Sequence, residues 1–209
     1  MSPNPPGRSA WPELRFAEWR DSGATLQLWT QIVGKLRLAL SPWLNHGWQV
    51  PLYISARGLG SSAMHVGGGR LVEVEFDLVD HRLVIRSSDA AEHGFALAPM
   101  SVAAFYRRFM AEIAAIGIHV AINLRPNEVA DPIPFPDDET HAAYDPAAVH
   151  TVWRALVQAD ACSAISAVAF SARRARCICS GVPSTSRSRA SRAGRHRCIR
   201  AASPACPTR

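Results

Sequence analysis

Apolar residues recur at helical spacing in three segments of the chain. Over 19–40 they return every three or four positions, which predicts an amphipathic helix. The same periodicity predicts a second helix over 102–116, for which Ser101 is a suitable N-cap. A third helix is predicted over 146–158, because Asp145 supplies an N-cap and a proline follows at the first helical position.

Between the first two helices the period changes to two. Val72, Val74, Phe76 and Leu78 alternate with acidic residues, which predicts a strand with one buried face and one wet face. A short turn at Asp80-His81 leads into a second strand and predicts a hairpin. The glycine-rich segment 58–69 is predicted to be a loop, and three further segments are predicted to be strands: 48–56, 95–98 and 118–123. Mixed rather than strictly alternating elements favour an α+β fold, with an antiparallel or mixed sheet and three main helices.

Charge divides the chain into two unlike parts. Residues 161–209 contain ten arginines, no acidic residue and all five cysteines of the chain. Removing those ten from the 23 basic residues leaves 13 against all 17 acidic residues, so residues 1–160 carry a formal net charge of −4. The chain therefore divides into a leader expected to be disordered (1–10), an α+β domain (11–160) and a basic tail expected to be disordered (161–209).

The tail offers two functional signals, and both are weak. Its arginines could bind a phosphate backbone, but it has a single aromatic residue, Phe170, and so lacks a stacking platform for bases. Its Cys and His residues lack the paired CxxC spacing of structural zinc sites, so no metal site is predicted. Neither a signal peptide nor a membrane span is evident, which predicts a cytoplasmic protein.

Several segments together resemble one bacterial family of unknown function. They are WPEL (11–14), LWTQIVGKLRLALSPWLNHGWQVPLYISARGL (28–59), EFDLVDHRLVIRSSD (75–89), DPIPF (131–135) and YDPAAVHTVWRALVQAD (144–160). The resemblance is dense over residues 11–160. It implies no activity, cofactor or catalytic residue that could be carried over to this chain.

The tail departs from that family. Members continue after the last helix with apolar sequence such as HLFWGSFDLAVTRFSGR, which this chain lacks. Back-translation of residues 178–192 (ICSGVPSTSRSRASR) permits LFWGSFDLAVTRFSG in the neighbouring frame. We therefore interpret the tail as the product of a frameshift near Ala161. Such a frameshift would leave the domain truncated and without its C-terminal strands. Sequencing of the coding DNA tests this, since an intact frame without such a match would contradict it.

Two groups of residues are candidates for a site in the domain. The first is an aromatic and polar set in which Trp29, Gln31, Trp48 and Tyr53 could line a small-molecule pocket beside Lys35 and His46. Equally, the tryptophans could be core residues, with Lys35 extended towards solvent. The second is the hairpin turn, where Asp77, Asp80 and His81 could hold a metal or transfer protons. Such residues more often only form the turn.

The long proline-rich segment 125–144 gives a third, weaker signal. Asp137, Asp138, Glu139 and His141 could form a metal site or a lid, although a solvated acidic loop is the simpler interpretation. The segment Gly67-Gly68-Gly69 precedes a strand rather than a helix, so it does not fit a phosphate-binding loop.

Two classes of function remain open from sequence alone. The domain could be an enzyme or small-molecule binder whose catalytic candidates are Lys35, His46, Asp77 and His81, or it could be a non-catalytic interaction module. Nucleic-acid binding through the tail is a further, weaker alternative. No cofactor or partner is indicated, but missing strands would expose apolar surface and favour self-association.

Overall fold

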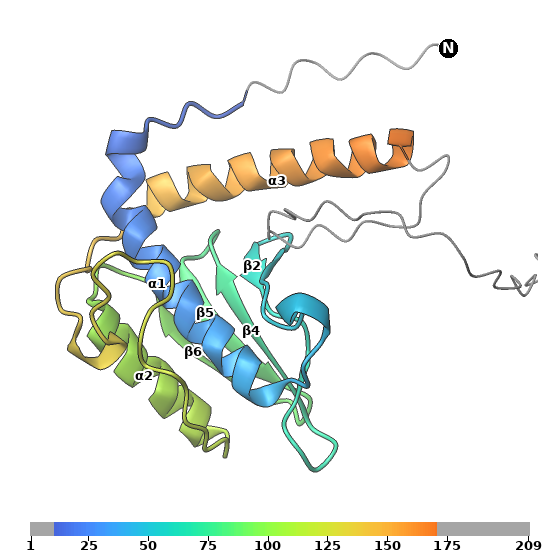
Figure 1. The fold of residues 1–209 in the computed structure, drawn as a ribbon, viewed down its shortest axis with the longest axis vertical. Helices are drawn as coiled ribbons and strands as arrows, with labels where there is room; N and C mark the ends of the chain where they lie inside the picture. The colour runs from blue at the N-terminus through green and yellow to red at the C-terminus, as the bar shows by residue number, and fades with distance from the viewer. Residues whose placement is uncertain (1–10, 171–209) are drawn as a thin grey trace, which may run out of the picture.

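The computed structural model describes residues 11–170, with side-chain burial as far as residue 163. Three helices and a six-stranded antiparallel sheet form an α+β fold (Figure 1). The helices are α1 (Phe16–Leu40), α2 (Val102–Ala115) and α3 (Pro146–Phe170), with short 3-10 turns η1 (Asn45–Gly47) and η2 (Phe135–Asp137). The strands are β1 (Tyr53–Ile54), β2 (Gly58–Gly60), β3 (Met64–His65), β4 (Leu71–Asp77), β5 (Arg82–Ser87) and β6 (Glu92–Ala96).

The hairpin of β4 and β5 is the centre of the sheet. Six residue pairs connect the two strands, from Val72 opposite Ser87 to Asp77 opposite Arg82. The strand order is β1-β2-β4-β5-β6, and β3 pairs with the same edge of β4 as β2 does. The predicted alternation is confirmed, because Val72, Val74 and Phe76 are fully buried.

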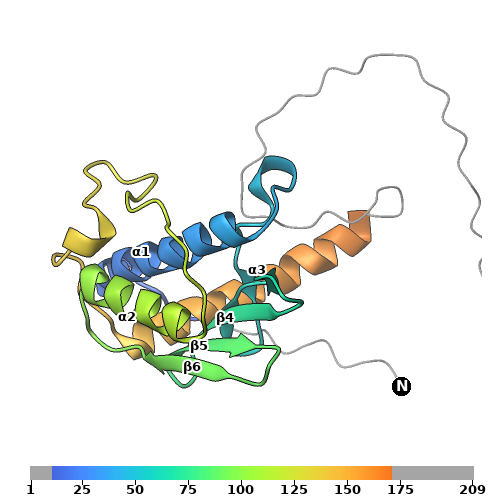
Figure 2. The same cartoon turned by 90° about the horizontal axis from the view of Figure 1, so that it is seen from below.

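Helices α1 and α2 cover one face of this sheet (Figure 2). Aromatic rings fill the space between the two layers. The Trp29 ring stacks 4.8 Å from Phe105 and 5.4 Å from Tyr144, measured between centroids. Phe105 also contacts the rings of Phe76 and Phe95. The opposite face of the sheet carries charged side chains, including Arg82, Arg86 and Glu92, as expected for an antiparallel sheet with one wet face.

All three predicted helices are present. Ser101 caps α2 by accepting a hydrogen bond from the backbone N–H of Ala104, and Asp145 caps α3 through the N–H groups of Ala147 and Ala148. Helix α3 continues to Phe170, well past the predicted end near residue 158. The added residues 161–170 include no Gly or Pro and are rich in alanine, so they favour helix. The expected domain boundary at Asp160 therefore falls inside a helix.

Three strand or loop predictions need correction. The predicted strand 118–123 is irregular backbone. Its alternation is nevertheless real, since Ile118 is buried and Val120 and Ile122 pack against the core. The segment 48–56 contributes only the two residues of β1. The predicted loop 58–69 contains β2 and β3.

Glycine itself made β2 hard to recognise, because glycine is depleted in strands. A Cβ at Gly58 would clash with the carbonyl oxygen of Phe76, so the close approach of β2 to β4 requires glycine there. Gly94 in β6 has φ +148°, and a Cβ there would clash with the carbonyl oxygen of Leu83. Both glycines thus let neighbouring backbones come together in the sheet.

Candidate functional site

The predicted aromatic set does not form one pocket. Trp29 is fully buried between Phe105 and Tyr144, so it belongs to the core. Gln31 and Lys35 lie further along α1 and contact Asn127. The Gln31 amide donates to the Asn127 carbonyl oxygen (3.0 Å) and accepts from the Asn127 N–H (2.9 Å). Gln31 therefore fastens the long loop to α1.

Lys35 supports the same loop. Its Nζ donates to Asn127 Oδ1 at 3.3 Å and lies 5.9 Å from the centre of the Phe135 ring. Burial lowers the pKa of Lys35, because desolvation disfavours the charged amine. Phe135 is fully buried. The contacts of Lys35 are therefore those of a residue that packs a loop against the core.

After the C-terminal end of α1, His46 lies within η1, Trp48 follows η1, and Tyr53 begins β1. Trp48 and Tyr53 are 43% and 42% exposed, and His46 is exposed with φ +53°. The Arg37 guanidinium lies over the Tyr53 ring at 5.7 Å. Arg37 itself is buried, where it donates to the Pro51 carbonyl oxygen and to Ser62 Oγ.

The hairpin residues lie at the other end of the molecule. The N–H of Asp145 donates to Ser22 Oγ near the start of α1, and Tyr144 next to it contacts His81. From Ser22 to the end of α1 is about 27 Å at 1.5 Å per residue. The catalytic candidates therefore divide into Asp77 and His81 at one end, His46 at the other, and Lys35 between them.

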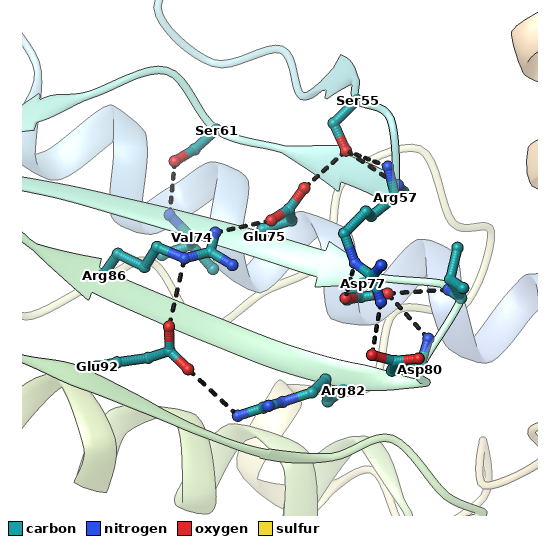
Figure 3. A network of polar contacts seen from close by, with 12 residues as sticks. Ser55, Arg57, Ser61, Val74, Glu75, Asp77, Asp80, Arg82, Arg86 and Glu92 are labelled. Atoms are coloured by element: carbon teal, nitrogen blue, oxygen red, sulfur yellow. Dashed lines mark hydrogen bonds and ion pairs between the residues drawn. The ribbon is translucent and has the colours of Figure 1, made fainter.

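Asp77 forms the turn between β4 and β5 (Figure 3). One carboxylate oxygen accepts from the N–H groups of Val79 and Asp80, and the other accepts from Arg57 Nε at 2.5 Å. The second Arg57 branch pairs with Asp80 at 2.6 Å. Burial alone would raise the pKa of Asp77, but Arg57 and the two N–H groups outweigh it and lower the pKa. Asp77 has the contacts of the turn-forming alternative.

His81 and Tyr144 form a pair behind that turn. His81 Nδ1 and the Tyr144 hydroxyl are hydrogen-bonded at 3.0 Å, and the two rings meet edge to face. Burial lowers the pKa of His81, and the nearby His150 adds to the effect, so neutral imidazole is favoured. Burial also raises the pKa of the Tyr144 phenol well above its usual range.

The simpler interpretation of the acidic loop, that it is solvated, does not hold for every residue. Asp138 is 1% exposed and accepts hydrogen bonds from the N–H groups of Thr140 and His141 and from the His141 ring. The carbonyl oxygen of Asp138 accepts from Ala103 N–H at the start of α2. Asp138 thereby anchors the loop to the helix. Among residues 11–170, no group of three or more metal-binding side chains is assembled.

A cleft of about 590 Å³ lies where α3 meets the edge of the sheet. Helix α3 runs across this end of the molecule, and its last turns extend beyond the sheet in both views (Figures 1 and 2). The walls of the cleft are formed by apolar side chains and a few polar ones. They include Ile54, Ser55, Val79, His150, Trp153 and Arg154.

Ser55 connects the cleft to a polar network on the open face of the sheet. Its hydroxyl donates to Glu75 at 2.7 Å and accepts from the N–H groups of Arg57 and Gly58. Glu75 also pairs with Arg86, which reaches Glu92 in turn (Figure 3). The Ser55 side chain is therefore held in one orientation beside the cleft.

Sequence reasoning missed the cleft residues of α3. His150, Trp153, Arg154 and Val157 are spaced i, i+3, i+4 and i+7, so they share one face of the helix. That spacing was visible in the sequence. The partner surface was not, because β1 and the β4–β5 turn meet α3 only after folding. The tail cysteines and histidine considered as metal ligands beyond residue 170 lie outside the described residues.

A family model described as a family of unknown function, DUF5996, matches residues 11–178. The chain belongs to the DUF5996 family. The match covers the whole described structure, including the part of α3 after Asp160. Comparison with curated proteins and with solved structures finds no match. None of the helices in residues 11–170 has the length and apolar character needed to span a membrane.

Proposed function

We propose that this DUF5996 domain binds a small organic molecule in the cleft between α3 and the edge of the sheet. The observation that carries the proposal is the convergence of three distant chain segments on one hollow of about 590 Å³. They are the β1–β2 turn, the β4–β5 turn and α3. Cavities of roughly 300–1,000 Å³ are the usual size for small-molecule sites.

The lining of the cleft has the mixture that such sites use. Ile54, Val79 and Val157 provide apolar walls, and Trp153 lies beside them with only 7% of its surface exposed. The His150 ring lies 5.3 Å from the Trp153 ring, between centroids. A few placed polar groups in an apolar surround fix the orientation of a ligand.

Filling the cleft tests the proposal. Val157→Trp places a large side chain in the hollow, whereas Leu156→Trp is a matched control because Leu156 is 38% exposed and outside the lining. A fragment library is screened against the full-length chain by ligand-observed NMR. Hits should lose binding to Val157→Trp and keep it with Leu156→Trp. If every hit binds both variants equally, or no fragment binds the parent chain, the proposal is wrong.

A second candidate function is self-association through the segment around η1. Trp43, Leu44 and Trp48 are 70%, 53% and 43% exposed, which is unusual for large apolar side chains on a monomer. The segment has a defined shape, because the N–H of Leu44 donates to Oε1 of the buried Gln49. Tryptophan is enriched among residues that dominate protein interfaces.

Analytical ultracentrifugation tests whether the chain associates through the η1 segment. The parent chain should associate with rising concentration, and Trp43→Ser should shift it towards monomer. Trp11→Ser is the control, because Trp11 is 58% exposed but lies before α1. Equal effects of the two substitutions, or a parent chain that is monomeric throughout, would exclude the η1 segment as an interface.

A further inference from the structure

The arginine that lines the cleft differs from its neighbours in having no counter-charge. Arg154 is exposed and makes no ion pair or side-chain hydrogen bond with the side chains of residues 11–163. Most other arginines of the described structure lie within 3.5 Å of a carboxylate, including Arg57, Arg70, Arg82, Arg86 and Arg107. Among the arginines without a carboxylate partner in the described structure, Arg154 is the one that lines this cleft, which makes it a candidate anchor for an anion.

We propose that the ligand of the cleft is an organic anion, a carboxylate or phosphate ester attached to a flat apolar body. This inference rests on the proposed small-molecule function and names its ligand class. Guanidinium presents donors in a fork that matches both carboxylate and phosphate oxygens. His150 lies one helical turn before Arg154 and lines the same cleft, so it adds a second nitrogen donor at this end.

The other charges near the cleft leave Arg154 available. Asp77 and Asp80, on the turn that supplies Val79, are both held by Arg57. Ser55 is engaged with Glu75. Asp160 lines the cleft as well, but it lies six residues after Arg154, which is about 9 Å along the helix. The anionic group of a ligand is therefore expected at the His150 and Arg154 end, away from Asp160.

The apolar body fits the rest of the lining. Trp153 and Val157 follow the same face of α3, and Ile54 and Val79 lie on the sheet side. A flat ring between these walls would displace water from apolar surface, at roughly 25 cal/mol per Å² buried. A fused two-ring compound with one acidic group has a size suited to a cleft of about 590 Å³.

Three matched naphthalene compounds test the ligand class by isothermal titration calorimetry on the full-length chain. They are 1-naphthoate, 1-naphthyl phosphate and the neutral 1-naphthylmethanol. At least one anion should bind about tenfold or more tightly than the alcohol, and the better anion identifies carboxylate or phosphate. Arg154→Gln should remove that preference. Arg125→Gln should keep it, because Arg125 is also exposed without a carboxylate partner among residues 11–170 but lies outside the cleft.

The outcomes separate the ligand class from the site. Equal binding of all three compounds, abolished by Val157→Trp, would leave the cleft as a ligand site and overturn the anion inference. The anion inference is also overturned if Arg154→Gln and Arg125→Gln act alike. Binding of none of the compounds would overturn it as well, and the fragment screen then decides the cleft separately. Thermal unfolding of each variant by circular dichroism confirms that it is folded.

Discussion

Trp29 and Trp153 show how two regions of the same domain differ. Both residues are buried, and neither indole N–H has a hydrogen-bond partner among the described residues. Trp29 lies between the rings of Phe105 and Tyr144, in the closed layer between the sheet and helices α1 and α2. Trp153 instead lines an open cleft at the α3 end.

The two regions differ in how completely their side chains fill the space around each tryptophan. In the closed layer each ring contacts other rings, so removal of one leaves a void that its neighbours cannot fill. At the α3 end the helix crosses the edge of the sheet instead of lying along it, and the side chains of residues 11–163 leave a cleft between them. The first region supplies stability, and the second region has room and polar groups for a ligand.

Removal of the two tryptophans should give the largest effect. Trp29→Ala is expected to lower the free energy of unfolding by about 3–5 kcal/mol, the usual range for a large aromatic residue in a packed core. Trp153→Ala should lower it by about half as much, because one side of that ring already borders open space. Urea unfolding measures both. Equal losses would show that the α3 end is packed as tightly as the core.

Addition of volume should give the same ranking, with the packed core less tolerant than the cleft. Ala103→Leu, at a fully buried position of α2, is expected to cost about 1–3 kcal/mol through overpacking. Val157→Trp should change stability by less than about 1 kcal/mol, because the cleft has space for the larger ring. Thermal melting of the two variants checks this. A loss at Val157 as large as that at Ala103 would mean that the hollow closes in solution.

Acid should weaken the turn beside the cleft through Asp77. Its native pKa is lowered, so its contribution to stability is present above the ordinary value near 3.8 and is lost as the pH falls through the lower native value. Asp77→Asn is expected to lower the free energy of unfolding by about 1–3 kcal/mol at pH 7. On acidification the variant should lose less stability than the parent chain. Asp80→Asn, 64% exposed, is the control and should change little. Unfolding between pH 6 and 3 measures both.

Substitution of His81 should give the smallest effect, and it should appear at a higher pH than the effect of Asp77. Its native pKa is lowered, so protonation favours the unfolded chain and stability falls as the pH drops below about 6.5. His81→Asn removes this dependence and tolerates φ +50°, since asparagine is among the residues found at positive φ. Urea unfolding from pH 7.5 to 5.5 measures the free energy of unfolding at each pH, and this energy should change less with pH in the variant than in the parent chain. Parallel slopes would contradict the lowered pKa.

The elements predicted well are those whose side chains and backbone partners are close in sequence. Ser101 and Asp145 cap their helices as predicted, and the β4–β5 hairpin forms around the turn at Asp80-His81. The segment 118–123 shows the limit. Its alternating burial was readable, but it pairs with no strand of the described sheet, and no local pattern reports that. Gly58 is the reverse case, a residue that looked like loop and pairs with Asp77.

The sequence by itself determined which residues prefer helix or strand, which faces are apolar, and the membership of residues 11–178 in one family. The helix and strand preferences and the apolar faces depend on local conformational preference and on the spacing of apolar side chains. Only the tertiary structure decided that Trp29 is core, that Gln31 and Lys35 hold a loop, and that Arg154 lines a cleft with Ser55 and Val79. These residues are far apart in the sequence and become neighbours only when the chain folds, so the sequence spacing does not reveal their contacts.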